Sequence, residues 1–446
     1  MGSFVPCTPD ERRQMLAAVG VSAFEDMYAS VPEGIRLGEN GLSLEKGLSE
    51  MEALRKMERL AGKNRVYASV FRGAGSYRHY IPAIVRRVTS KEEFLTAYTP
   101  YQAEISQGIL QSIFEYQTMI CELTGMESAN ASVYDGASAA AEAAAMCRDR
   151  KRTGVLVSEG LHPHAAQTVR TYAWGALDMA EAVRDGAGQT ETVPLTDGRT
   201  DPERLGAMLN DRTACVIIQQ PNYFGQIEDV EKIAEKVHSC GAKLIVSVNP
   251  IALGLLKSPG ECGADIAVGE GQPLGLPMGF GGPYLGFMAA RESMMRKLPG
   301  RIVGQTQDAR GQRCYVLTLQ AREQHIRREK ASSNICSNEA LCALTAGAYL
   351  SAMGPKGLKE VAVSCASKAH YLAKRLSEIG YPPVFEGPFF HEFVTRPLSK
   401  KTEEKLMEAS ILPGLSTPEG TIWCCTEMCS KEEMDRVVKL IGEAED

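Results

Sequence analysis

The residues best placed for chemistry lie in a glycine-rich stretch from Gly263 to Ala290. We predict an apolar strand at Ile266–Val268, a turn, and a second strand at Tyr284–Ala289. In open α/β folds, ligands bind at strand ends of this kind. Between Asp265 and Arg291 the sequence has no lysine. A site here therefore offers carboxylate and amide groups but no amine for covalent catalysis.

A second candidate is the turn Tyr134–Ser138, which follows a predicted strand at Ala131–Val133 and enters an alanine-rich helix. Unpaired N–H groups and the positive end of the helix dipole suit a phosphate group at such a turn. The alternative is that Asp135 or Ser138 only caps the helix. The sequence leaves both interpretations open.

Other motifs indicate little chemistry. His162 and His164 lack nearby carboxylate or thiolate support, so a stacking or capping pair is favoured over a metal site. Cys424, Cys425 and Cys429 have no nearby histidine. Complete dinucleotide-binding, Walker A, nucleophile-elbow and His-Glu-x-x-His patterns do not occur. We therefore predict that the chain binds no metal.

The order of the predicted elements indicates the fold class. From Gly154 to Val248, strands rich in apolar β-branched residues alternate with amphipathic helices, which predicts a mainly parallel sheet covered by helices on both faces. We expect an N-terminal helical arm (1–65) that packs on the body or on another subunit. A large α/β domain (66–330) and a smaller C-terminal α+β domain (331–446) follow, the latter opening with a long helix.

Composition narrows the class of protein. The 446 residues are 44% hydrophobic and 23% charged with a net charge of −6, which is ordinary for a globular protein without nucleic-acid partners. The 13 cysteines form no Cys-x-x-Cys pair, which favours reduced thiols. Signal, transit and membrane-spanning patterns are not found. We expect a cytoplasmic protein that interacts with no membrane.

The frame around the glycine-rich turn resembles fold-type I pyridoxal-phosphate (PLP) enzymes, of the PLP-dependent transferase-like class. Longer runs carry a more specific resemblance, among them HYIPAIV (79–85), NASVYDGASAAAEAAAM (130–146), PNYFGQIED (221–229) and REKASSNICSNEALCAL (328–344). These runs resemble the glycine decarboxylase family, the P-protein of the glycine cleavage system, in the form of subunit 1 of the split bacterial enzyme. The resemblance covers essentially the whole chain.

The resemblance implies that a second subunit of the same fold carries the PLP lysine. In this chain Gln272 and Pro273 stand at the lysine position. Asn249 stands where a carboxylate would pair with the pyridine nitrogen, and an amide cannot replace that anion. The resulting degenerate pocket is expected to contain Asp135, Gly136, Ser138, His162, Asn249, Glu270, Gln272 and Pro273, with no catalytic residue of this chain.

Because fold-type I enzymes have active sites at subunit interfaces, the resemblance also implies residues that complete the partner's site. Tyr98, Tyr101 and Gln102 are candidates for a substrate channel, since tyrosine suits a passage that is partly apolar and partly wet. Ser332, Ser333 and Asn334, expected to open the long helix, are candidates for contacts with the partner's PLP phosphate. The alternative for this second group is a cap on its own helix.

The implied function is that of the subunit without the lysine in glycine dehydrogenase (aminomethyl-transferring), an oxidoreductase of glycine catabolism. With subunit 2 it would decarboxylate glycine and pass the aminomethyl group to the lipoyl arm of H-protein, as a heterotetramer with two copies of each subunit. One alternative is a structural scaffold or H-protein docking subunit. Another is an independent enzyme, in which Lys243 or Lys257 would have to reach the pocket.

Overall fold

The computed structural model describes residues 7–37, 41–98, 100–175, 190–279, 282, 284–319, 324–331 and 333–445, without the side chains of His325 and Glu445. The chain divides into two compact units, Met1–Val66 and Tyr67–Asp446. No helix in the described ranges is both long and apolar enough to cross a membrane.

The first unit is helical. It contains α1 (Pro9–Val19), two short 3-10 helices, η1 (Phe24–Tyr28) and η2 (Glu33–Ile35), and α2 (Glu50–Ala61). Thr8 caps α1 through a capping box with Glu11, with Pro9 at the first helical position as the sequence predicts. Helix α2 is strongly amphipathic, yet its apolar residues Met51, Leu54 and Met57 are more than half exposed.

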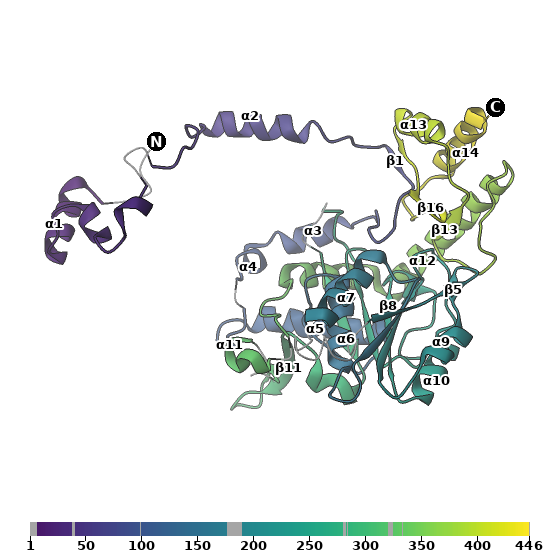
Figure 1. The fold of residues 1–446 in the computed structure, drawn as a ribbon, viewed down its shortest axis with the longest axis horizontal. Coiled ribbons are helices and arrows are strands. Elements are labelled where there is room, and N and C mark those ends of the chain that lie inside the picture. Colours follow the sequence, from purple (N-terminus) through teal and green to yellow (C-terminus); the bar gives the residue numbers. More distant parts are fainter. Residues whose placement is uncertain are drawn as a thin grey trace. The chain divides into compact units, whose positions relative to one another are not determined.

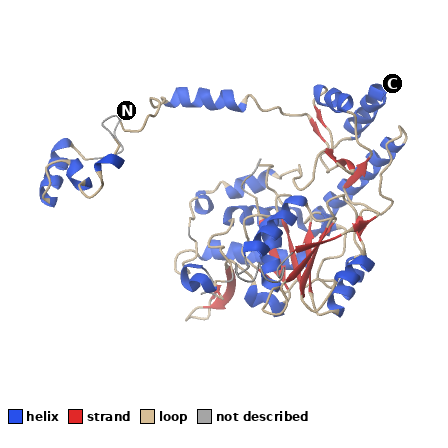
Figure 2. Cartoon of the chain, in the orientation of Figure 1, coloured by secondary structure: helices blue, strands red, loops and turns tan. Residues whose placement is uncertain are grey.

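A seven-stranded sheet organises the second unit (Figures 1 and 2). Four of its six neighbouring strand pairs are parallel, and β10 makes the antiparallel pairs with β9 and β2. In spatial order the strands are β2 (Ser128–Ala129), β10 (Gly286–Ala290), β9 (Ile266–Glu270), β8 (Lys243–Val248), β7 (Thr213–Gln220), β3 (Gly154–Ser158) and β4 (Thr190–Val193). The predicted mainly parallel sheet is confirmed.

Helices cover both faces of the sheet. Alternate residues of β7 show why, because Cys215 and Ile217 belong to one buried apolar cluster and Val216 and Ile218 to the other. The first cluster packs under α6 (Gly136–Cys147) and α7 (Pro163–Gly175). The second packs under α5 (Gln107–Thr124), α9 (Pro202–Met208), α10 (Val230–Ser239) and part of α12 (Ala340–Ser377).

A smaller three-stranded sheet forms a separate core near the C-terminus. Its strands are β13 (Glu392–Thr395), β16 (Gly420–Cys424) and β15 (Leu415–Thr417), and helices α13 (Lys400–Glu408) and α14 (Lys431–Glu445) lie beside it (Figure 1). Trp423 is fully buried there. Helix α12 serves both cores, since Tyr349 packs under the large sheet and Leu372 packs in the smaller core.

Short elements connect these layers. A parallel ladder joins β1 (Ser69–Val70) to β14 (Ile411–Leu412), and a hairpin joins β11 (Ile302–Gln307) to β12 (Arg313–Thr318). The remaining elements are α3 (Ala83–Thr89), α4 (Glu92–Leu95), β5 (Leu195–Thr196), β6 (Arg199–Thr200), η3 (Ala252–Gly254), η4 (Glu292–Lys297), α11 (Gln324–Arg327) and η5 (Arg328–Lys330).

Helix α12 begins later than the sequence suggests. The long helix was expected to open at Ser332, but its first residue is Ala340. Side chains compete with helix formation before that point. Ser333 Oγ accepts a bond from the backbone N–H of Ile335, and Ser132 Oγ accepts one from the N–H of Glu339. The stretch before Ala340 is therefore held without helical hydrogen bonds.

Gly225 follows strand β7 of the large sheet and lies against Glu392 of β13 in the smaller core. A substitution at Gly225 therefore tests how much this close contact contributes to stability. The φ of Gly225, +82°, is left-handed, and a Cβ at this position would overlap the carbonyl of Glu392. Gly380 has the same φ of +82° but faces open space. We expect Gly380→Ala to cost about 1–2 kcal/mol from backbone strain alone. Gly225→Ala should cost roughly 2 kcal/mol more because of the overlap.

The comparison is made by urea unfolding of both variants. Equal losses of stability would show that the close approach of Gly225 to Glu392 is unimportant.

Candidate functional site

A cavity of about 340 Å³ lies where strands β8 and β9 end and helices α6 and α7 begin. Six of the predicted pocket residues line it: Asp135, Gly136, His162, Asn249, Glu270 and Pro273. Ser138 and Gln272 are not among the lining residues. The described part of the lining contains no lysine, so it offers no primary amine side chain.

Glu270 fills the N-terminus of α6. Asp135 caps the helix by accepting a bond from Ser138 N–H at 2.7 Å. The backbone N–H of Gly136, the first residue of α6, donates to Glu270 Oε2 at 3.0 Å. Glu270 Oε1 accepts bonds from Gln272 N–H at 2.9 Å and Leu285 N–H at 3.0 Å. Two of the N–H groups at the start of α6 that would suit a phosphate group, those of Gly136 and Ser138, are therefore already bonded to carboxyl groups of the chain itself.

Burial dominates the electrostatics of Glu270. Removal of the side chain from water raises its pKa to about 7, while the N–H bonds from Leu285, Gly136 and Gln272 act in the opposite direction. The close approach also explains Gly136, because a Cβ there would lie 2.8 Å from the backbone nitrogen of Glu270. The start of α6 and the end of β9 are therefore in close contact, with no room for a side chain at Gly136.

Gln272 has a structural role in this arrangement. Its side chain is buried, Oε1 accepts from Tyr77 N–H at 2.9 Å, and Nε2 donates to the carbonyls of Tyr77 at 2.9 Å and Leu276 at 2.8 Å. Both amide hydrogens and the amide oxygen are thus used. The side chain ties the turn after β9 to the loop that contains Tyr77, which is itself part of the cavity wall.

Two further polar side chains of the cavity, Asn249 and His162, are also engaged in hydrogen bonds. Asn249 Oδ1 accepts from Ile251 N–H at 2.9 Å, and its Nδ2 lies 3.4 Å from His391 Nε2. His162 bonds to the carbonyl of Ala74 through Nε2 at 3.0 Å and accepts from His164 N–H through Nδ1. Burial lowers the pKa of His162, so the neutral ring donates from Nε2.

Glu392 was not foreseen as part of the site. Its carboxyl group accepts from Ala74 N–H at 2.6 Å and from the Tyr77 hydroxyl at 2.8 Å. Ala74 has a φ of +53°, which is unfavourable for a residue with a Cβ, and this bond helps hold it. Glu392 follows Ala74 by 318 residues, so the pairing leaves no local pattern in the sequence.

The second group of candidates lies on another part of the molecule. Tyr98 is 93% exposed, and Gln102 and Asn334 are also exposed. Tyr101 is half-buried, with its hydroxyl bonded to Asn338 Oδ1 at 2.5 Å and its ring 4.7 Å from the Arg301 guanidinium carbon. The segment around Tyr101 and the segment before α12 therefore lie side by side, a pairing that the sequence alone did not reveal.

Ser333 makes a contact within the chain. Its hydroxyl donates to Glu142 Oε1 at 2.8 Å, and burial raises the pKa of Glu142 to about 7. Ser332 lies outside the described residues. Of the three residues proposed for the partner's phosphate, Asn334 alone is both described and exposed.

Comparisons with known proteins give this geometry a context. A family model described as glycine cleavage system P-protein matches residues 2–441. A Moorella thermoacetica protein named probable glycine dehydrogenase (decarboxylating) subunit 1 is 51% identical over 98% of each chain. A crystal structure of glycine decarboxylase (P-protein) in inhibitor-bound form has a TM-score of 0.88 and 42% identity, covering 99% of this chain and 100% of that one.

A more distant structure defines the fold. A C-DES mutant with glycine linked to its PLP cofactor has a TM-score of 0.61 at 15% identity, covering 87% of this chain and 99% of that one. The predicted fold-type I architecture is confirmed. The cavity nevertheless does not fit PLP, because Glu270 bonds to the first N–H of α6, the described lining has no lysine, and Asn249 offers a neutral amide where a pyridinium nitrogen needs an anion.

Removal of the Glu270 side chain should destabilise the chain by about 3 kcal/mol or more, since three buried N–H groups lose their acceptor. Formate, a carboxylate that fits the vacated space, should restore part of this loss in Glu270→Ala. Glu142→Ala removes a different buried glutamate, which lies on α6 and does not bond to its first N–H group, and serves as the control. An equal effect of formate on both variants in urea unfolding would contradict an anion site at the α6 entrance.

Glu392 should make stability depend on pH. Burial raises its pKa from 4.5 to about 7, so the folded state holds the proton more tightly than the unfolded state. Stability is then highest below about pH 4.5 and decreases by up to about 3 kcal/mol as the pH rises to about 7. Glu392→Gln should remove this share of the decrease, while Glu270 and Glu142, whose pKa values are also raised to about 7, keep theirs. Parallel unfolding profiles for the two proteins across this range would contradict the assignment.

Proposed function

Because the chain belongs to the glycine cleavage system P-protein family, we propose that it acts in glycine decarboxylation as the subunit that does not carry the cofactor. The observation that carries this proposal is the filled α6 entrance, where Glu270 takes the N–H groups of Gly136, Gln272 and Leu285. A second subunit then supplies the lysine and the PLP. This chain contributes no group that bonds covalently to substrate or cofactor.

The curated relatives are named subunit 1, and this name supports the proposal of a partner, subunit 2. Within that complex, glycine loses its carboxyl group and the aminomethyl group passes to the lipoyl arm of H-protein. We assign the complex two copies of each subunit and a cytoplasmic location. The helical arm (1–65) is proposed to pack at a subunit interface, and the chain keeps the proposed large (66–330) and C-terminal (331–446) domains.

The contribution of this chain is proposed to come from the face formed by Tyr98, Gln102 and Asn334. All three are exposed in the single chain, so a partner can cover them without disturbing the fold. Tyr101 positions this face through its bond to Asn338, which in turn donates to the carbonyl of Ala131 at 3.2 Å. A tyrosine-lined passage offers both apolar surface and hydroxyl groups to glycine and to the lipoyl arm.

The first experiment is to mix the purified chain with PLP, add borohydride, and map any modified lysine by mass spectrometry. We expect no stoichiometric adduct with this chain alone, and an adduct on subunit 2 in the reconstituted complex. A single stoichiometric adduct on a lysine of this chain would overturn the proposal.

Substitutions at the exposed face distinguish an active contribution from a purely structural one. Tyr98→Ala and Asn334→Ala should lower turnover per assembled complex at least tenfold, because the passage and a cofactor contact are lost. Trp174→Ala removes another aromatic side chain that is 71% exposed and should leave turnover unchanged. Reduced assembly with normal turnover per complex would instead favour the scaffold or docking function.

A further inference from the structure

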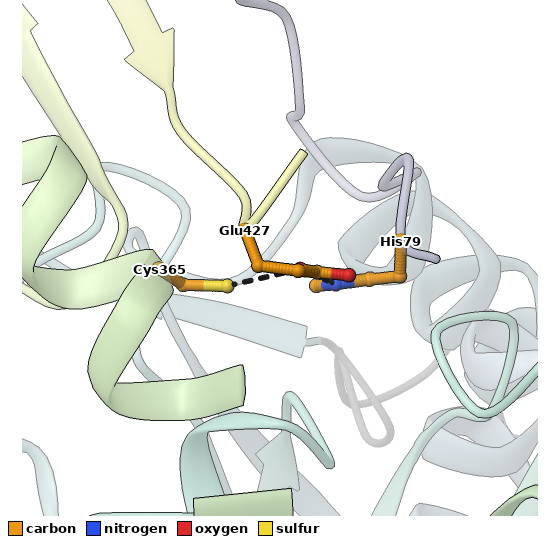
Figure 3. Close-up of side chains that lie close together, drawn as sticks. All are labelled: His79, Cys365 and Glu427. Carbon is orange, nitrogen blue, oxygen red and sulfur yellow. Dashed lines mark hydrogen bonds and ion pairs between the residues drawn. The ribbon is translucent and has the colours of Figure 1, made fainter. Parts of the chain in front are cut away.

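Three potential metal ligands meet beside the smaller core (Figure 3). His79 lies in the segment after β1, Cys365 lies on α12, and Glu427 lies in the loop between β16 and α14. His79 Nδ1 is 2.7 Å from Glu427 Oε2, and Cys365 Sγ is 3.4 Å from the same oxygen. These pairs are separated by 348 and 62 residues in the sequence, which is why no ligand spacing was visible there.

The cluster is largely shielded from water. The side chains of His79 and Glu427 are 2% and 14% exposed, and Cys365 is fully buried. Lys368 lies one turn along α12 from Cys365, but its ammonium group donates to the backbone carbonyl of Glu427. Tyr80 N–H donates to Glu427 Oε1 at 2.7 Å, which orients the carboxylate and leaves Oε2 facing His79 and Cys365.

Unsatisfied polar atoms gather around this cluster. His79 Nε2, Tyr349 Oη and His391 Nδ1 are buried and have no hydrogen-bond partner among the described residues. Burial is the main cause of the raised pKa of Tyr349 and of the lowered pKa of His391. Glu427 and Cys365 add to the first shift and His79 adds to the second, so both residues lie within electrostatic reach of the cluster. Buried polar atoms normally have partners. Three such atoms around one cluster indicate a site that accommodates an ion and its bound water.

The geometry suits a tetrahedral ion with mixed ligands. The three ligand atoms lie within 4.8 Å of one another. Zinc bonds of about 2.0–2.3 Å to nitrogen, oxygen and sulfur place neighbouring ligand atoms roughly 3.3–3.7 Å apart. The distance between Cys365 and Glu427 already falls in this range, and the shorter distance between His79 and Glu427 needs to open by about 0.6 Å.

We propose that His79, Cys365 and Glu427 bind one zinc-class divalent cation, with water in the fourth position. The Cys365 thiol loses its proton to solvent and binds as thiolate. The hydrogen on His79 Nδ1 moves to Nε2, so that the Nδ1 lone pair is free to bind. A thiolate and a carboxylate then balance the two positive charges of the ion, which a buried site requires.

Such an ion would connect α12 and the smaller core to the wall of the cavity. His79 follows the cavity residue Tyr77 by two positions, and His391 lies between Tyr77, at a ring distance of 4.8 Å, and Asn249. The ion therefore holds in place the same loop that Gln272 and Glu392 hold from the other side. We assign it a structural role, since neither the cavity at the start of α6 nor the one beside Thr200 is lined by any of its three ligands.

The test uses the full-length chain without an affinity tag, stripped with a chelator and titrated with Co²⁺. We expect one Co²⁺ per chain, visible d–d bands of tetrahedral cobalt, and a thiolate charge-transfer band in the near ultraviolet. Zn²⁺ should displace the cobalt. Cys365→Ser should abolish the charge-transfer band, and Glu427→Gln should weaken binding at least tenfold.

Cys342→Ser is the matched control, because Cys342 is another buried cysteine of α12 outside the cluster and its loss should leave the spectrum unchanged. X-ray absorption of the zinc-loaded wild-type chain gives a test that depends on no variant, with one sulfur and three nitrogen or oxygen neighbours expected. The absence of saturable binding, a charge-transfer band that survives Cys365→Ser, or several sulfur neighbours from Cys424, Cys425 and Cys429 would each overturn the proposal.

Discussion

The arrangement of the cavity depends on one buried carboxylate, that of Glu270. It bonds to the first N–H of α6, to the turn after β9 and to the residue before β10, so three elements are fixed by one side chain. The positive end of a helix normally favours an anion from solution or a cofactor. In this chain the carboxyl group of Glu270 takes that position. The fold can therefore keep its cavity without depending on a bound phosphate for the integrity of the α6 entrance.

The sequence predicts the parts of the structure that rest on local patterns. The apolar runs of β7 and β8 and the helix cap at Asp135 each depend on residues that are close together in the sequence. The overall architecture was predicted from the resemblance to the P-protein family. Pairings over long distances are not predicted in this way. The bonds from Ser333 to Glu142 and from Tyr101 to Asn338 span 191 and 237 residues. The same pairings explain why α12 begins at Ala340, because its preceding segment is bonded elsewhere.

The two predicted groups of site residues have different roles. Asn249 and His162 in the cavity, and Gln272 behind its wall, bond mostly to backbone groups of the chain itself, and such bonds stabilise a shape. Tyr98 and Asn334 are exposed side chains. Contacts between subunits require groups of this second kind, since a group already satisfied within the chain gains little from a partner. This difference supports a contribution at the interface over one inside the cavity.

A single substitution to lysine would also not be enough to make the cavity bind PLP. A lysine in place of Gln272 would leave Tyr77 N–H and the carbonyls of Tyr77 and Leu276 without the amide, a cost of roughly 1–3 kcal/mol for each unsatisfied group. Glu270 would still hold the first N–H of α6, a donor that suits a phosphate. Both positions would have to change together, and the loop containing Tyr77 would need a new support. Under the proposed function, the packing of the cavity wall, and not the identity of one residue alone, opposes covalent binding of the cofactor.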